Sequence, residues 1–401
     1  MPAMKVLRAS GAEGAEWSEA LGLFPHPDVY YRPEYARAYE EIGQGMAAAF
    51  LLRARGGAVL HPLMLRRIDE LPWASAVPGA VGALDAVSPY GYSGPLCSTE
   101  GPEARAALLD EFDAVLAAEC RRMRIVSEFV RFHPLLRTHE GMQGRMDLIR
   151  RGETVWMKLS GDETGMRAAM KPAARNKISR ARREGVHVEA EEGDEAVRTL
   201  VALYHHTMEK LSAPAGYFFP ESYFRSLAAL PGGRGEILVA RRNGVPLWAG
   251  AFLREGEFLH YHLSGSAAGD RTPGVNNLAL LTAALRGASA GARVLHLGGG
   301  FGASTDSLFA FKASLSDLRA EYWTGQRIHD AGLYEALCEA RPRSIARGRT
   351  GEAARGGGGM EAEDGARGGE DRSFFPAYRL PVPGATSPTG SAAAVDGSLE
   401  G

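Results

Sequence analysis

The segment GARVLHLGGGFGASTDSLFAFKASLSDL, residues 291–318, joins a strand pattern to a glycine-rich turn and then to a single lysine. Residues 293–297 have the length and apolar composition of a buried strand, and 298–302 form the turn. Glycine reaches backbone angles that other residues avoid, so such a turn can aim the segment that follows it. That segment carries Phe311 and Lys312, and the pattern indicates a cation placed beside a reacting group.

Composition limits the class of protein before any further motif is considered. A chain of 401 residues is long for a single hydrophobic core, so two domains are expected. The formal net charge of −2 means that any contact with nucleic acid would need a local basic patch. No apolar run approaches the ~20 residues that span a bilayer. The start of the chain also lacks a signal-peptide core, so we expect a soluble cytoplasmic protein.

Cysteines and histidines give no metal-binding signature. Three widely spaced cysteines form no CxxC motif, which argues against a disulfide framework or a structural zinc site: Cys97, Cys120 and Cys338. His205 and His206 are adjacent and point to different faces, whereas His260 and His262 share one face of a strand. Two histidines alone fall short of a metal site, so we predict no metal and no bound cofactor.

Hydrophobic periodicity predicts a chain of alternating strands and helices after a helical entry over residues 1–45. Helices are predicted at 102–122, 195–212, 221–230, 278–290 and 329–340. Strands are predicted at 48–53, 58–65, 125–132, 154–160, 186–190, 236–241, 246–253, 257–264, 293–297 and 320–327. This order indicates an α/β (α+β) protein with mixed, mostly antiparallel sheets flanked by helices.

The most basic part of the chain is 162–184, DETGMRAAMKPAARNKISRARRE, which is predicted to be helical. Asp162 or Thr164 can cap its start, and Pro172 can begin a second helix within it. Its cations, Arg175 among them, either form a solvated helix face or bind phosphates or an RNA backbone. Both interpretations stay open at this point.

A second candidate anion-binding site is the loop 269–277, which precedes the helix at 278–290. The start of a helix leaves several backbone N–H groups without partners, and such groups attract anions. We expect the anionic part of a donor molecule to bind there, with Arg175 nearby. The loop residues assigned to this site are Arg271, Gly274, Asn276 and Asn277.

Aromatic residues on glycine- and proline-rich turns are candidate ligand contacts. Tyr90 and Tyr92 lie in SPYGYSGPL, 88–96, where a loop side chain either contacts a ligand or caps the edge of a domain. Tyr217 begins a second aromatic turn, YFFP, before the helix at 221–230.

The run GGGFGA at 298–303 also satisfies a dinucleotide-binding fingerprint, with Glu321 about twenty residues further on. That fold needs more strands and helices downstream than this chain has before its low-complexity end. The sequence contains no GxSxG, Walker or HExxH motif either. Three meandering strands, a loop and helix, a strand and a short helix are instead typical of GNAT-type acyltransferases.

Six segments together resemble the FemA/FemB/FemX family and its GNAT-related relatives. They are RNKISRARREGVHV (175–188), TMEK (207–210) before YFFPESYF, LHYHLSGS (259–266), PGVNNLALLTAAL (273–285), LHLGGG (295–300) and DSLFAFKASLS (306–316). The resemblance covers roughly 150–325 well and 20–150 more loosely. The chain lacks the long helical arm of some cell-wall members, and the early lysine of the family has no clear counterpart, Arg32 being the nearest basic residue.

The resemblance implies formation of an amide bond. In the family an amino acid moves from aminoacyl-tRNA, as co-substrate, to an amine of a peptidoglycan precursor or a peptide-like metabolite. By the same resemblance Phe311 and Lys312 lie at the transfer site, where Lys312 stabilises an oxyanion or holds the tRNA end. Some substrate-binding positions are implied by the resemblance, and others are suggested by the aromatic turns and the strand histidines. Together they are Lys210, Tyr261, Tyr92, Tyr217 and His262. The base for the amine stays open among His260, His262, Asp306 and a substrate group.

The resemblance also implies a domain division. Residues 1–152 are expected to form a first GNAT-like domain and 153–321 a second one with the transfer site. Residues 322–340 are expected to return to the first domain. The rest is divided into a low-complexity linker at 341–372, a docking strand at 373–380 and a disordered tail at 381–401.

Two alternatives to aminoacyl transfer stay open. One is an N-acyltransferase that uses acyl-CoA, which the overall charge near zero favours. The other is a GNAT-fold binding protein without activity, against which the Phe311-Lys312 pair argues. The amino acid, the acceptor and the oligomeric state are not determined by the sequence.

Overall fold

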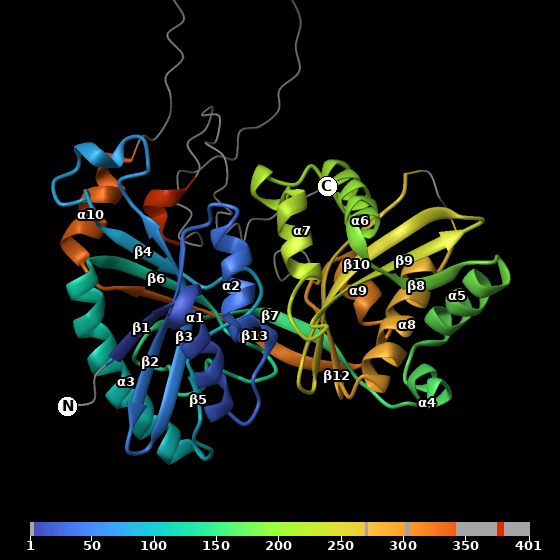
Figure 1. The fold of residues 1–401 in the computed structure, drawn as a ribbon, viewed down its shortest axis with the longest axis horizontal. Helices are drawn as coiled ribbons and strands as arrows, with labels where there is room; N and C mark the ends of the chain where they lie inside the picture. Colours follow the sequence, from blue (N-terminus) through green and yellow to red (C-terminus); the bar gives the residue numbers. More distant parts are fainter. Residues whose placement is uncertain (1–3, 269–271, 301–304, 342–374, 381–401) are drawn as a thin grey trace, which may run out of the picture.

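The computed structural model describes residues 4–268, 272–300, 305–341 and 375–380. Its strands form one sheet of thirteen strands, in the order β1-β2-β3-β4-β6-β13-β7-β12-β11-β10-β9-β8, with β5 (Leu96–Cys97) paired to β3. Helices cover the sheet on both halves of the molecule (Figure 1). The predicted class, a mixed and mostly antiparallel α/β fold, is confirmed. The sheet runs without a break from one half to the other.

The first half has a simple element order, which we call the first repeat. It consists of β1 (Met4–Arg8), α1 (Gly11–Ala20), α2 (Pro33–Glu40), β2 (Met46–Ala54), β3 (Gly57–Arg67), β4 (Leu84–Val87), α3 (Pro102–Met123) and β6 (Ile125–Arg131). The first four strands pair antiparallel, and β6 runs parallel to β4. The predicted helical entry therefore begins with a strand, β1, which the sequence pattern missed.

The second half repeats this order, and we call it the second repeat. It consists of β8 (His187–Glu191), α6 (Gly193–Lys210), α7 (Glu221–Ala228), β9 (Gly235–Arg242), β10 (Val245–Glu255), β11 (Phe258–Ser266), α8 (Val275–Ser289) and β12 (Val294–Gly298). Again four strands pair antiparallel, and the fifth runs parallel to the fourth. Two helices follow the first strand in each repeat and one helix precedes the fifth.

Two long strands join the repeats at the middle of the sheet. β13 (Leu318–Ile328) lies between β6 and β7 (Asp147–Lys158), and β7 in turn pairs with β12. Figure 1 shows the first repeat on the left, the second on the right and these strands between them. Among the described residues, no helix is both long and apolar enough to cross a membrane.

The basic segment folds as two short helices, α4 (Glu163–Ala168) and α5 (Pro172–Arg183). The Asp162 carboxylate accepts hydrogen bonds from the backbone N–H groups of Thr164 and Gly165, which makes Asp162 the N-cap of α4. Pro172 is the first residue of α5, where its missing N–H costs nothing. Both local predictions are confirmed.

The segment 375–380 docks on the first repeat, but not as the predicted strand. Residues Ala377–Arg379 form a 3₁₀ helix, whereas 373–374 lie outside the described residues. Each edge of β4 is already paired, to β3 on one side and to β6 on the other, so no strand edge is free at this place. Side chains anchor the segment instead. The Tyr378 hydroxyl is 2.7 Å from the Ser127 hydroxyl, and Arg379 pairs with Asp85.

Candidate active site

The second repeat opens where its two parallel strands part. β11 and β12 pair only over Phe258–His260 and Val294–His296, and β11 then continues to Ser266 without β12. In the first repeat the equivalent strands, β4 and β6, stay paired to the end of β4. A further backbone hydrogen bond then joins the Ser88 N–H to the Phe129 carbonyl. Of the two repeats as described, the second is therefore the one with a separated strand pair.

Lys312 ends a short helix, α9 (Ser307–Lys312), beside this opening. The Asp306 carboxylate caps α9 by accepting a hydrogen bond from Phe309 N–H at 2.8 Å. The Lys312 side chain is buried. Its Nζ donates a hydrogen bond to the Gly299 carbonyl at 2.5 Å and lies 5.8 Å from the centre of the Tyr261 ring. Burial lowers the pKa of Lys312 to about 8, against an opposing effect of Asp306, so the ammonium is mostly charged at pH 7.

Gly298 lies close to the Lys312 ammonium and has no side chain. Its φ is +78°, and a Cβ built on it would lie 3.4 Å from Lys312 Nζ and 3.6 Å from the Tyr92 hydroxyl. Tyr92 comes from a loop of the first repeat, and its ring contacts His296 of β12 with the ring centres 5.0 Å apart. The two repeats therefore bring an ammonium and a phenol hydroxyl to the same small space above one glycine.

We expect Gly298→Ala to reduce activity through this space, and Gly185→Ala to serve as its control. Both glycines have φ of +78°, so both substitutions carry a similar backbone cost of about 1 kcal/mol. A Cβ at Gly185 would have nothing within 4 Å, whereas one at Gly298 would place an apolar methyl group in van der Waals contact with Lys312 Nζ and the Tyr92 hydroxyl. Thermal unfolding should shift similarly in both variants, and transfer activity should fall only in Gly298→Ala. Equal activity in the two would contradict this assignment.

The remaining predicted substrate residues lie on several different elements. Tyr261 stacks on Phe252 with the ring centres 5.6 Å apart, and its hydroxyl bonds to that of Ser264. Phe311 is half-buried and packs against the core of the second repeat. The Tyr217 carbonyl accepts a hydrogen bond from the Tyr204 hydroxyl at 2.6 Å. Lys210 is the exposed last residue of α6.

The proposed donor residues have local packing roles that their sequence pattern did not show. A Cβ on Gly274 would lie 2.2 Å from the Lys177 carbonyl oxygen, so α5 needs a glycine there to pack against the start of α8. Arg175 donates to the carbonyl groups of Ala168 and Met170 at 3.2 and 3.0 Å, which terminates α4. Asn277 is buried in the first turn of α8.

The rest of the predicted donor site is described only in part. Asn276 is half-buried, and Arg271 lies outside the described residues. Two other arginines of α5 are paired with carboxylates, Arg182 with Glu163 and Arg180 with Glu184. Binding of an anionic donor at this end of α8 stays a prediction.

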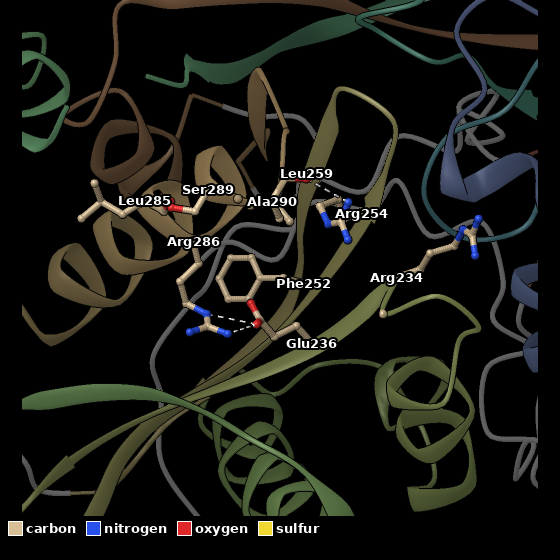
Figure 2. A pocket seen from close by; sticks show the side chains of 11 residues that line it. Arg234, Glu236, Phe252, Arg254, Leu259, Leu285, Arg286, Ser289 and Ala290 are labelled. Atoms are coloured by element: carbon tan, nitrogen blue, oxygen red, sulfur yellow. Dashed lines mark hydrogen bonds and ion pairs between the residues drawn. The ribbon is translucent and has the colours of Figure 1, made fainter. Parts of the chain in front are cut away.

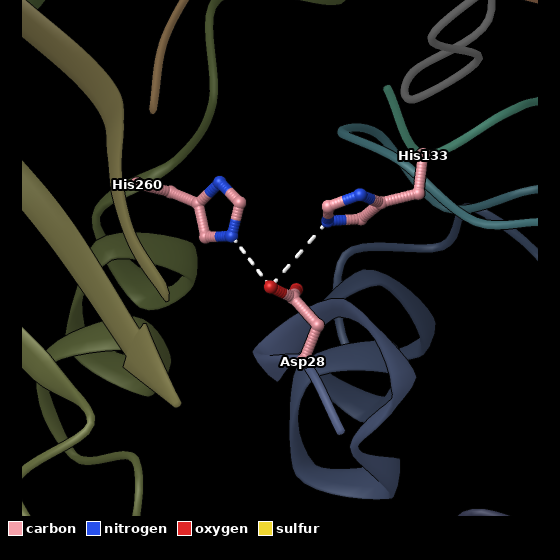
Figure 3. Close-up of side chains that lie close together, drawn as sticks. All are labelled: Asp28, His133 and His260. Carbon is pink, nitrogen blue, oxygen red and sulfur yellow. Dashed lines mark hydrogen bonds and ion pairs between the residues drawn. The ribbon is translucent and has the colours of Figure 1, made fainter. Parts of the chain in front are cut away.

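One buried polar cluster was not predicted from the sequence. Asp28, His133 and His260 lie together where the repeats meet, and their possible ligand atoms are all within 4.8 Å of one another (Figure 3). The Asp28 carboxylate is 2.7 Å from His260 Nε2 and 3.4 Å from His133 Nε2. Asp28 and His260 are 232 residues apart in the chain, and no spacing motif connects them, so the sequence carries no signal for this contact.

The hydrogen bonds of this cluster fit a structural network better than a metal centre. Leu136 N–H donates to His133 Nδ1 at 3.0 Å, so this nitrogen carries a lone pair. In the neutral ring Nε2 then carries the hydrogen and faces Asp28 as a donor, whereas a metal ligand would need a lone pair there. Burial raises the pKa of Asp28, but its two histidine partners outweigh this and keep it well below the usual value.

A separate pocket lies on the second repeat at the far end of α8 (Figure 2). Residues of β9, β10 and β11 and the last turn of α8 line it, including Phe252 and three arginines. Two of these arginines are paired, Arg286 with Glu236 and Arg234 with Glu255. None of the predicted site residues lines this pocket, and α8 begins at the other end, near Gly274.

Comparison with known proteins supports a GNAT-related fold. A family model described as an acetyltransferase (GNAT) domain matches residues 170–313, which hold the whole second repeat. The structure is similar to that of FemX, with a TM-score of 0.60, 13% identity and coverage of 82% of this chain and 99% of that one. A conserved protein of unknown function from Bacteroides thetaiotaomicron has a TM-score of 0.51 and 9% identity, covering 81% of this chain and 99% of that one.

A third similar structure is L-PGS from Bacillus licheniformis, with a TM-score of 0.49, 12% identity and coverage of 84% and 97%. No curated protein matches the sequence. The GNAT-related fold and the likeness to FemX that the sequence motifs implied are confirmed. At these identities the likenesses establish the fold.

Proposed function

We propose that this chain, whose fold is that of GNAT-related acyltransferases, forms an amide bond by moving an aminoacyl group from aminoacyl-tRNA to an amine. The observation that carries the proposal is Lys312, a buried cation that lies beside Gly298 at the opening between β11 and β12. The acceptor would be an amine of a peptidoglycan precursor or of a peptide-like metabolite. The resemblance to the FemA/FemB/FemX family supports this choice of donor and acceptor.

The chemistry needs little beyond positioning and one cation. The amine nitrogen attacks the ester carbonyl, the C–N bond forms, and the carbonyl oxygen becomes an oxyanion before the ester C–O bond breaks. Aminoacyl esters are already activated, so the main demand is to hold the reactants and stabilise this charge. The Lys312 ammonium supplies a donor in a buried site, where its effect is larger than in water. The departing tRNA hydroxyl takes up the proton that the amine loses.

An acyl-CoA donor is the second candidate, and one observation favours it. Glu163 and Glu184 already neutralise Arg182 and Arg180 of the basic helix, which reduces the positive surface available to tRNA. Both donors are activated acyl compounds with anionic parts, so Lys312 would serve either one in the same way.

Transfer assays with both donors distinguish these candidates. Charged tRNA and acetyl-CoA would each be offered to a panel of amines, including peptidoglycan-precursor peptides, with and without RNase. We expect transfer from charged tRNA that RNase abolishes and Lys312→Met strongly reduces. Activity that survives RNase would contradict the tRNA donor, and transfer from acetyl-CoA alone would establish the second candidate.

A further inference from the structure

A half-buried arginine lies without an acidic partner where the first repeat joins β13. Arg131 is the last residue of β6, and its Cζ lies 5.1 Å from the centre of the Phe129 ring. One of its five guanidinium N–H groups donates to the Ser88 carbonyl at 3.3 Å. Over the ranges that the structure describes, Arg131 forms no ion pair, whereas Arg32 pairs with Glu255. The protein therefore leaves this cation available to an anionic ligand.

The hydroxyl of Tyr90 lies close to this cation. Burial raises the pKa of Tyr90, the phenol of Tyr217 adds to the rise and the charge of Arg131 opposes it. The phenol of Tyr322 makes a further, smaller contribution. A charged or polar group changes a neighbour's pKa strongly only at short range, so these four polar ends lie near one another. All four side chains are half-buried, so three phenols and one guanidinium share a partly open surface.

The same surface reaches the space beside Lys312. The ring of Tyr322 lies 5.7 Å from that of Tyr92, measured between the ring centres. The Tyr92 hydroxyl is 3.6 Å from the position of a Cβ on Gly298, and Lys312 Nζ is 3.4 Å from the same position. Tyr92 is half-buried as well. Half-buried tyrosines therefore connect Arg131 to the cation of the proposed transfer site.

The tyrosines and Lys312 approach the opening between β11 and β12 from opposite faces of the sheet. Tyr90 and Tyr92 pack against a core that includes residues of α2, α6 and α7. Phe311, beside Lys312, packs against a core that includes residues of α5 and α8, and the predicted donor loop lies at the start of α8. Successive residues of β9 alternate between the two cores, so the cores lie on opposite faces. An acceptor bound along the tyrosines would therefore meet the donor at the opening.

We propose that Arg131 binds a carboxylate of the acceptor, so that the substrate class is an amine that also carries a carboxylate, as a peptide does. This inference rests on the proposed amide-forming function. A planar guanidinium forms two parallel N–H···O bonds to one carboxylate, and the two charges are equal and opposite. Arg131 is then a specificity-determining residue. It lies away from the reacting atoms, so its contribution belongs to binding of the acceptor and not to the chemical step.

Titration calorimetry of the full-length protein without a donor tests this contact directly. The probes are lysine-containing peptides of increasing length, each prepared with a free and with an amidated C-terminus. We expect a peptide whose carboxylate form binds about ten- to hundredfold more tightly than its amide, the worth of a hydrogen-bonded charge. Arg131→Gln should bind the two forms alike, and Arg131→Lys should keep part of the preference, because it retains the charge without the fork of donors. Equal affinity for both forms of every peptide, or binding of neither form, would overturn the inference.

Arg124→Gln is the matched control for these variants. Arg124 follows α3, donates to the Val81 carbonyl at 2.8 Å and, like Arg131, forms no ion pair within the described ranges. Its substitution therefore removes a guanidinium bonded to a backbone carbonyl at a place away from the tyrosines. The preference for the carboxylate form should be unchanged in Arg124→Gln. An equal loss of preference in both glutamine variants would contradict the assignment to Arg131.

Steady-state kinetics with whichever donor is active give a second readout. In Arg131→Gln the KM for the carboxylate form should rise about ten- to hundredfold, whereas kcat and the KM for the amide form should stay unchanged. A folded Arg131→Gln protein that still prefers the carboxylate form would refute the role of Arg131 while leaving transfer by Lys312 in place. Absence of transfer to every amine would refute the proposed function, and the calorimetric preference would still decide the role of Arg131.

Discussion

Lys312→Met is expected to lower kcat for transfer about 10²–10³-fold, the loss seen when one donor to an oxyanion is removed. Methionine has a similar length, so it fills the space beside Gly298 without supplying a charge. Burying the ammonium costs free energy, and its removal should leave the folded state at least as stable. The measurement is single-turnover transfer at saturating donor and amine, together with thermal unfolding of the variant.

The pH dependence gives the same prediction a second, independent check. Because the pKa of Lys312 is lowered to about 8, its cation is complete well below that pH and is lost above it. We therefore expect the transfer rate of the unmodified protein to fall as the pH rises through about 8, and this decline to be absent in Lys312→Met. Lys5→Met, at an exposed lysine of β1, is the control for loss of a lysine elsewhere. A folded Lys312→Met protein that transfers at the normal rate would remove Lys312 from the mechanism.

Asp85→Asn is expected to destabilise the folded protein by about 3–5 kcal/mol, the usual cost of breaking a buried ion pair. The Asp85 carboxylate is fully buried, accepts from Arg66 Nε at 2.6 Å and also pairs with Arg379 of the docked segment. Asparagine keeps the shape but leaves the Arg66 charge without a partner in the interior. It also removes an anchor of 375–380, so this segment should become more sensitive to protease. Urea unfolding followed by circular dichroism measures the loss.

An exposed ion pair provides the control for this substitution. Asp110 pairs with Arg145, but its side chain is 74% exposed, so Asp110→Asn should change the unfolding midpoint little. Burial raises the pKa of Asp85, yet Arg379 and Arg66 outweigh this and lower it overall. Its stabilising effect is therefore complete above the unfolded pKa of about 3.9 and is lost as the pH falls through the folded value. The gap between Asp85→Asn and the unmodified protein should narrow in acid, and equal midpoints at pH 7 would contradict the role of Asp85.

Much of the fold could be predicted because the responsible signals are local. α3, α6 and α8 follow from apolar residues at helical spacing, and Asp162 and Pro172 mark helix starts through contacts within three residues. The first repeat was harder to predict. β4 and β5 are only four and two residues long, too short for a periodic pattern, and β1 was absorbed into a predicted helix.

In the candidate site, too, the features with local signals could be predicted and those that depend on long-range contacts could not. Gly298, Asp306 and Lys312 lie within fifteen residues, so turn and cap chemistry alone place the lysine after the strand. At the predicted donor loop the sequence did not show a packing role of Gly274, which allows the close approach of Lys177, 97 residues away in the chain. Contacts of that kind depend on how helices pack, and a single sequence does not display them.

By itself the sequence therefore determined the order of strands and helices in the second repeat, the resemblance to a GNAT-related family and the identity of the candidate lysine. Only the tertiary structure decided that the repeats share one sheet, that Tyr92 and Lys312 both lie close to Gly298, and that the Tyr223 hydroxyl contacts His262. The physical reason is sequence separation. Periodicity and turn chemistry act over a few residues, whereas Tyr39 and Tyr223 meet across 184 residues through the packing of two repeats.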